Sequence, residues 1–320
     1  MEIRKLEYDE YEKLINFIDE AFDKKDGGRF EDILPKLYFK DNKSFIHYGV
    51  FDEDILVSVC GVYPDTLVSP YGELKVAGLG AISTKKEYRN KGCFQKIVTY
   101  TLEKIKDDYD LIFLSGNRYR YNHFDFENAG RTLIVEINDR TRNALNPKDY
   151  EIKDLVENDL DSVKLCLDLY NTQKVRIKRD INSFYKVTRS WLSSIKMVYS
   201  NDEFIGYFSL SQGCLAFEAL YKDGYRDTLY DAIISLTHKA FVFMDTSNLS
   251  EELLNVVDDY KLEHNQMYKI LNIDNVLKFL NISSFDYSKY TQKELVKILL
   301  GCDEKEGLNG SLHISILDKS

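Results

Sequence analysis

The segment YRNKGCF, residues 88–94, decides how the fold is interpreted, because it joins a strand pattern to a helix pattern. A β-rich run, 74–83, precedes it, and the apolar spacing that follows predicts an amphipathic helix over 94–105. The next apolar run, 111–114, has the length of a strand buried on both faces beside a crossover helix. Strand, helix and strand in this order predict a parallel pair of strands.

The residues before this core complete one α/β unit. Helices are predicted near 11–22 and 29–39, and two more β-rich runs, 45–51 and 55–63, lead into the strand at 74–83. Turn-forming residues separate the three β-rich runs. They therefore predict an antiparallel meander, which makes the whole sheet mixed and mainly antiparallel.

The same order of elements recurs after residue 150. Helices are expected at 159–170, 180–194 and 226–238, and strands at 151–152, 195–200, 204–211, 214–221, 240–244 and near Tyr268. The sequence thus predicts an α/β (α+β) protein with two tandem lobes, each a mixed sheet flanked by helices. The expected domains are 1–146, 147–271 and a short tail, 272–320. The tail carries helix patterns at 274–280 and 292–300 and a strand pattern at 310–317.

Composition excludes several classes of protein. The 320 residues include 53 acidic and 43 basic side chains, and a net charge of −10 disfavours nucleic acid as a partner. The five cysteines lie far apart without a C-x-x-C pair, which favours reduced thiols over a metal site. We find no apolar run long enough for a membrane span and no signal-peptide pattern, so we expect a cytoplasmic protein without a membrane partner.

The segment 88–94 has the features of a diphosphate-binding turn. A glycine before a helix start turns backbone N–H groups outward beside the positive end of the helix dipole, and Arg89 and Lys91 add charge. The alternative is an ordinary basic turn with a flexible glycine. The Walker A and dinucleotide-binding patterns are both absent.

The residues after the buried strand, 115–130, form an aromatic stretch that includes Tyr121. A tyrosine hydroxyl at the mouth of two diverging parallel strands is placed to protonate a leaving group. Aromatic residues at this spacing are otherwise wall or core. The pattern alone leaves both interpretations open.

Together these segments resemble the GNAT acetyltransferase superfamily. Residues 89–94 occupy its R/Q-x-x-G-x-G/A loop, and residues 121–126 resemble its Y-x-x-x-G-F element. Phe94 replaces the last small residue of the loop, and Asp125 replaces the second motif's glycine. Within the superfamily, the duplicated lobe and the run 116–130 are similar to the "enhanced intracellular survival" acetyltransferase group. That group has a catalytic lobe, a lobe without a cofactor loop and a sterol-carrier-like domain, of which the tail here is a shortened remnant.

The resemblance implies acetyl transfer from acetyl-CoA to a primary amine by direct attack in a ternary complex. It implies that Tyr121 protonates the departing thiolate and that no metal takes part. The residues that it assigns to the cofactor are Ala81, Ile82, Ser83, Arg89, Asn90, Lys91, Gly92, Cys93, Phe94, Gly116 and Asn117. The acidic composition suits a cationic amine. The resembled group forms ring-like homo-oligomers, and two alternatives stay open here: a homo-oligomer of this kind, or loss of part of that interface with the shortened tail.

The sequence leaves the identity of the general base open. The resembled group uses its terminal carboxylate, here that of Ser320; a water chain or no dedicated base are the alternatives. His123 is a second candidate base, and Cys93 at a helix start is a candidate for an acyl-cysteine intermediate. The rival function is a non-catalytic acyl-CoA sensor or interaction protein with the same fold.

Overall fold

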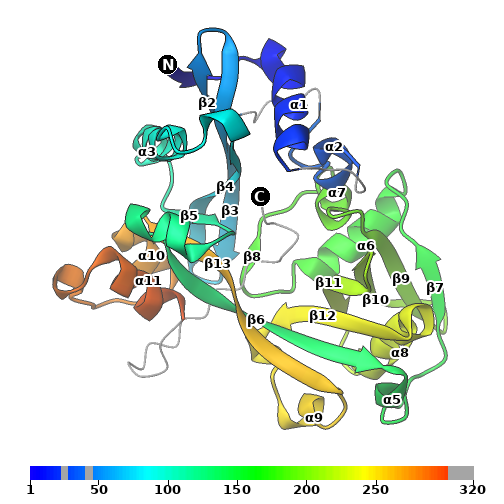
Figure 1. Cartoon of the computed structure of the whole chain (residues 1–320). Helices are drawn as coiled ribbons and strands as arrows, with labels where there is room; N and C mark the ends of the chain where they lie inside the picture. The colour runs from blue at the N-terminus through cyan, green and yellow to red at the C-terminus, as the bar shows by residue number, and fades with distance from the viewer. Residues whose placement is uncertain (23–27, 40–45, 302–320) are drawn as a thin grey trace. The chain divides into compact units, whose positions relative to one another are not determined.

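The computed structural model describes residues 1–22, 28–39 and 46–301 (Figure 1). They form two compact units: residues 1–129 together with 266–301, and residues 130–265. Strands β6 (Glu127–Asn138) and β13 (Asp259–Ile270) each have residues in both units. Helices flank mixed, mainly antiparallel sheets, which confirms the predicted fold class.

The sheet of the first unit has the strand order β1, β2, β3, β4, β5, β13. Its other strands are β1 (Glu2–Lys5), β2 (His47–Asp52), β3 (Ile55–Ser69), β4 (Gly72–Thr84) and β5 (Leu111–Leu114). Strands β4 and β5 are parallel, with Val76 opposite Leu111 and Gly78 opposite Phe113. Beyond Gly78 their pairing ends, so the two strands separate toward their carboxyl ends. The predicted parallel pair is confirmed.

Helix α3 (Cys93–Ile105) connects the two parallel strands and packs on the sheet. Its residues Ile97, Val98 and Ile105 are buried in one apolar cluster with strand residues of this unit. The remaining helices here are α1 (Tyr11–Ala21), α2 (Phe30–Ile33), α4 (Arg118–Tyr121), α10 (Ile273–Phe279), α11 (Gln292–Leu300) and the short 3-10 turns η1 (Tyr8–Glu10), η2 (Lys86–Tyr88), η3 (Asn122–Phe124) and η5 (Tyr287–Lys289). Helix α2 is much shorter than the predicted 29–39, because the residue before Pro35 is pushed out of the helical region.

The sheet of the second unit has the order β6, β12, β11, β10, β9, β7. Its strands are β7 (Glu151–Asp154), β9 (Ser194–Ser200), β10 (Glu203–Ser211), β11 (Leu215–Tyr221) and β12 (Lys239–Asp245), with a short β8 (Arg176–Ile177) in the same part of the chain. Its helical segments are α5 (Asp139–Arg142), α6 (Leu160–Tyr170), α7 (Phe184–Thr188), α8 (Arg226–Thr237), η4 (Thr246–Asn248) and α9 (Glu251–Leu254). Strands β11 and β12 are parallel, with Leu215 opposite Phe241, so the strand, helix, strand order of the first unit recurs here.

Two strands cross from one unit to the other along the chain. Strand β6 follows the first unit's β5 and α4 along the chain, but its residues 132–138 pair with β12 in the second unit. Strand β13 follows the second unit's β12 and α9, but its residues 267–270 pair with β5 in the first unit. Strand β6 is absent from the predicted elements, and the strand near Tyr268 was predicted for the second lobe. That assignment was wrong, because an apolar run shows that a strand is buried without specifying its neighbour.

The compact units therefore divide the chain differently from the predicted domains 1–146, 147–271 and 272–320. Residues 272–301 pack within the first unit through α10 and α11. The predicted division into two similar lobes and a carrier-like tail stays a prediction. The predicted strand at 310–317 lies outside the described residues. Among the described residues, no helix has the length and apolarity needed to cross a bilayer.

Candidate functional site

The turn between β4 and α3 presents open backbone at the start of a 13-residue helix. Gly92 is the N-cap of α3 and adopts a left-handed conformation with φ 76°, and Asn90 is also left-handed. Among the described residues, nothing lies within 4 Å of the position that a side chain at Gly92 would take. The start of α3 thus has free space beside the positive end of the helix dipole, which suits an anion.

A β-bulge in β4 lies before this turn. Gly80 pairs with Gly61 and Ser83 pairs with Val59, so Ala81 and Ile82 together stand opposite a single residue, Cys60. Ala81 is left-handed, with φ 53°, which is the backbone conformation of the first residue in one common type of bulge. The bulge interrupts the ladder on the separating strand, where backbone groups can serve a ligand.

A pocket of about 590 Å³ joins the bulge to the turn. Seven of the predicted cofactor residues line it: Ile82, Ser83, Arg89, Asn90, Gly92, Cys93 and Phe94. Ala81, Lys91, Gly116 and Asn117 are not among the lining residues. The lining also includes residues that sequence reasoning missed: Ala21, Phe22, Thr84, Tyr88, Gln95 and Arg120. Ala21 and Phe22, at the end of α1, were found only through the tertiary fold, since nothing in their spacing indicates a ligand.

The polar side of this pocket is positive. Arg89 and Arg120 are exposed and, among the described residues, neither forms an ion pair. The Lys91 ammonium lies 4.5 Å from the centre of the Tyr88 ring, and the Tyr88 hydroxyl donates a hydrogen bond to Asp52 at 2.9 Å. These guanidinium and ammonium groups make the turn a site for an anionic ligand even though the chain as a whole is acidic.

Tyr121 lies at the carboxyl end of α4, close to the end of β5. It is 6% exposed, and its ring packs against Phe94 at 5.6 Å and Phe126 at 6.3 Å between centroids. Its hydroxyl makes no hydrogen bond among the described residues. Burial raises the pKa of Tyr121 to about 12, so the phenol keeps its proton at neutral pH and can donate it.

Phe94 and Asp125, which differ from the resembled motifs, are both accommodated by the residues around them. Phe94 packs between Tyr121 and Phe124, and the pocket persists alongside it. Asp125 adopts the left-handed conformation, φ 66°, that a glycine would favour, and its carboxylate accepts a hydrogen bond from Lys269 at 3.1 Å. Aspartate tolerates this backbone region better than most residues.

The other candidate groups differ in their surroundings. Cys93 is 1% exposed, and its Sγ lies 3.8 Å from Sδ of Met1. His123 is exposed, and its ring lies 4.1 Å from that of Phe124. Ser320 lies outside the described residues. Within the described ranges, no group of three or more His, Cys, Asp or Glu side chains is arranged to hold a metal ion.

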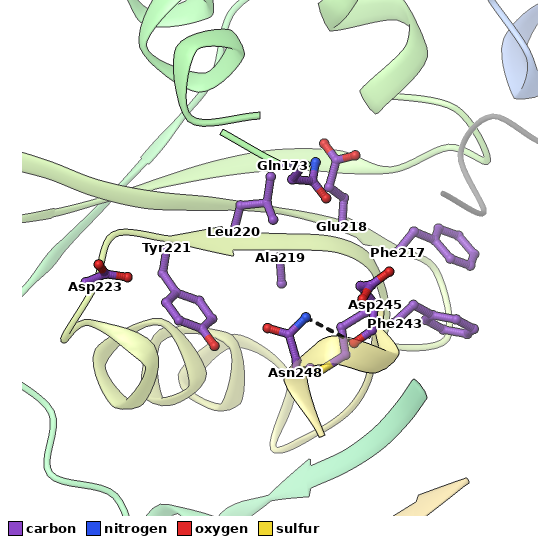
Figure 2. A pocket seen from close by; sticks show the side chains of 11 residues that line it. Gln173, Phe217, Glu218, Ala219, Leu220, Tyr221, Asp223, Phe243, Asp245 and Asn248 are labelled. Atoms are coloured by element: carbon purple, nitrogen blue, oxygen red, sulfur yellow. Dashed lines mark hydrogen bonds between the residues drawn. The ribbon is translucent and has the colours of Figure 1, made fainter. Parts of the chain in front are cut away.

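The second unit has a smaller pocket, of about 210 Å³, where β11 and β12 separate (Figure 2). Figure 2 shows Phe217, Glu218 and Tyr221 on β11 and Phe243 and Asp245 on β12 around it. Of the described residues that line it, three carry carboxylates, Glu218, Asp223 and Asp245, and none is a lysine or an arginine. The basic residues of the nearby turn are engaged elsewhere: Lys222 pairs with Glu203 at 2.7 Å, and Arg226 with Asp227 at 2.8 Å. This pocket lacks the charge that the first one offers to an anion.

The first unit has a counterpart among known families. Residues 2–129 match the acetyltransferase (GNAT) domain. This stretch contains the β4 bulge, the turn before α3 and Tyr121. The match supports an acyltransferase, as the sequence predicted. No curated protein matches the sequence.

Solved structures share the acetyltransferase fold at low sequence identity. A protein of Enterococcus faecalis described as a probable N-acyltransferase has a TM-score of 0.69 and 16% identity, covering 86% of this chain and 74% of that one. A GCN5-related N-acetyltransferase of Kribbella flavida has a TM-score of 0.64 and 12% identity over the same shares. Eis1 of Mycobacterium abscessus has a TM-score of 0.60 and 14% identity, covering 87% and 75%. The shared fold extends over both units of the chain.

Proposed function

We propose that the chain is an N-acetyltransferase that moves the acetyl group of acetyl-CoA to a primary amine by direct attack in a ternary complex. The observation that carries the proposal is the pocket of the first unit, which joins the β4 bulge to the positive turn before α3. Its open backbone at Gly92 and the guanidinium groups of Arg89 and Arg120 fit a diphosphate. When bound, acetyl-CoA supplies an activated thioester.

The residues that would hold the donor fall into two groups. The N–H groups of the turn, with Arg89, Lys91 and Arg120, would bind the diphosphate. The bulged backbone of Ala81, Ile82 and Ser83 would pair with the pantetheine arm, which would pass Gly116 and Asn117 at the end of β5. Arg120 is an addition to the residues predicted from the sequence, because it lines the same pocket.

The proposed step needs one hydrogen-bond donor and one acid from the chain. The N–H of Ile82 stabilises the thioester oxygen as negative charge develops on it. As the amine nitrogen bonds to the carbonyl carbon and the carbon–sulfur bond breaks, Tyr121 gives its proton to the departing thiolate. The proton released by the amine balances the reaction. The carboxylate of Ser320 or a water chain is proposed to receive it.

A cationic small molecule or peptide is the proposed acceptor class, because the net charge of −10 attracts cations at long range. The likeness of fold to the Mycobacterium abscessus protein Eis1 is consistent with the predicted group. Homo-oligomer formation is proposed on the same resemblance.

Calorimetric titration with acetyl-CoA tests the first step. We expect micromolar binding to the wild-type protein, weakened at least about tenfold in the double variant Arg89→Gln/Lys91→Gln, because two charge-assisted contacts are lost. The variant Lys104→Gln/Lys106→Gln is the matched control, since it removes two charges at the other end of α3. Binding should then be followed by a screen of amines for acetylation.

No heat and no thermal stabilisation at millimolar acetyl-CoA would overturn the proposal. Binding without acetylation of any amine, unchanged in Tyr121→Phe, would favour the acyl-CoA sensor instead.

A further inference from the structure

Two lysines from the end of the chain reach the turn that carries Tyr121. Lys269, on β13, donates to the carbonyl oxygen of Phe124 at 2.9 Å and to the Asp125 carboxylate at 3.1 Å. Lys293, on α11, donates to Oδ1 of Asn122 at 3.0 Å. All of these residues belong to the first unit. The partners lie 145 and 171 positions apart in sequence, so these contacts exist only because residues 266–301 pack back on this unit.

The turn has little regular structure of its own. Helix α4 is four residues long and η3 is three, and an isolated helix of this length is unstable. The turn ends at Asp125 in the left-handed region, where aspartate is less favourable than the glycine of the resembled motif. Other interactions must therefore fix its conformation.

Those interactions attach to both ends of the turn. At its start, Arg118 makes a two-pronged ion pair with Glu127, whose side chain is 3% exposed, and Asn122 donates to the same carboxylate at 3.3 Å. At its end, Lys269 is only 18% exposed, so its ammonium is largely removed from water and directed at the turn. The lysine contacts Asp125 and the neighbouring carbonyl at once, which holds the left-handed residue in place.

We infer that residues 266–301 act as an intramolecular brace for the acid of the reaction, with Lys269 and Lys293 as positioning residues for Tyr121. The inference rests on the proposed function. It gives residues 266–301 a role in the active site of the first unit. It also accounts for Asp125, because a glycine there would remove the carboxylate that Lys269 binds.

Hydrogen exchange on the full-length protein tests the brace without any activity. Lys269→Met and Lys293→Met keep most of the side-chain length and remove the ammonium. In the double variant, amides in 118–126 should exchange at least about tenfold faster, while those of α3 keep their rates. Lys289→Met is the control, since Lys289 is exposed and forms a local ion pair with Asp286 at 3.4 Å. Unchanged exchange in 118–126 would overturn the brace.

Kinetics test the positioning role. The double variant should lose about tenfold in kcat, while its Kd for acetyl-CoA stays within about twofold. Lys293→Arg in the wild-type background keeps a positive charge at this position, so it should keep most of the wild-type kcat. In a Tyr121→Phe background the same two substitutions should cost almost nothing further, because they act through the Tyr121 hydroxyl. Equal losses in both backgrounds, or faster exchange with unchanged kcat, would overturn the positioning role. A wild-type protein that acetylates no amine would overturn the proposed function, and with it the positioning role, whereas the exchange result would still decide the brace.

Discussion

The ring of Tyr121 lies against Gly116: a side chain at Gly116 would meet Cε2 of Tyr121 at 3.2 Å. Gly116 has φ 141°, a backbone conformation that residues with a side chain rarely adopt. Gly116, just after β5, thus lets the chain turn away from the strand and leaves room for the Tyr121 ring. The proposed acid is positioned by the absence of a side chain as well as by the side chains around it.

Replacing Gly116 with alanine should therefore lower both stability and turnover. We expect a loss of about 1–3 kcal/mol in the free energy of unfolding from the strained backbone, and a lower kcat because the new methyl group displaces the Tyr121 ring. Gly213→Ala is the matched control, since Gly213 also has a positive φ, 81°, but open space around it. Urea denaturation and steady-state kinetics on both variants check this. Equal effects on kcat would show that the contact with Tyr121 is unimportant.

The Tyr121→Phe variant should lose turnover and keep its cofactor. Removing a general acid costs on the order of 10²-fold in kcat or more, whereas the Kd for acetyl-CoA should stay within about twofold because the pocket lining is intact. Because the pKa of Tyr121 is raised to about 12, loss of its proton should not limit kcat between pH 7 and 10. Tyr119→Phe, at a residue that is 89% exposed, should behave as wild type.

Cys93 should prove dispensable for the chemistry. It lines the pocket but is 1% exposed, and direct transfer needs no acyl-cysteine. We expect Cys93→Ala to keep kcat within about threefold, with a stability loss of about 1 kcal/mol from the small cavity. Intact-mass analysis after incubation with acetyl-CoA checks for a thioester on the wild-type protein. An acetylated Cys93 together with an inactive alanine variant would establish the two-step route instead.

His47 should make the protein sensitive to mild acid. It is 1% exposed, its Nε2 lies 3.2 Å from the hydroxyl of Tyr63, and burial lowers its pKa to about 3. Between pH 6.5 and 3 the unfolded chain binds a proton here that the folded protein does not. The stability contributed by the neutral ring is therefore complete above pH 6.5 and is lost as the pH falls, by about 1.4 kcal/mol per unit.

Urea denaturation at pH 7, 6 and 5 measures this effect. Between pH 7 and pH 5, the free energy of unfolding should fall by about 2 kcal/mol less in His47→Gln than in the wild type, because glutamine does not titrate. His123→Gln, which removes an exposed imidazole, is the matched control. The same slope in His47→Gln as in the wild type would show that His47 is not the group responsible.

Several elements could be predicted closely from the sequence because they depend on local order. The strand at 111–114 has the predicted bounds, and α3 and α8 begin and end within one residue of the predictions. Each has a clear apolar pattern and a definite start or stop. The helix predicted over 180–194 is only Phe184–Thr188, because the chain turns through left-handed residues at Trp191 and Leu192. Apolar periodicity alone did not reveal that turn.

In the candidate site, too, some features follow from the local sequence and others depend on the tertiary structure. The turn at 88–94 could be predicted from the sequence, since a glycine that follows basic residues before a helix start has the same local geometry in many folds. The strand, helix, strand order that places this turn beside the end of β5 could be predicted as well. Both depend on neighbours within a few tens of residues.

Which distant segments meet at the site depends on the tertiary structure. It brought Phe22 and Arg120 into the pocket lining, paired β13 with β5, and set Lys269 and Lys293 against the turn that carries Tyr121. The physical reason is that a strand edge or a lysine can pair with any complementary partner. The partner is selected by the packing of the whole unit, and a pattern along the chain does not contain that choice.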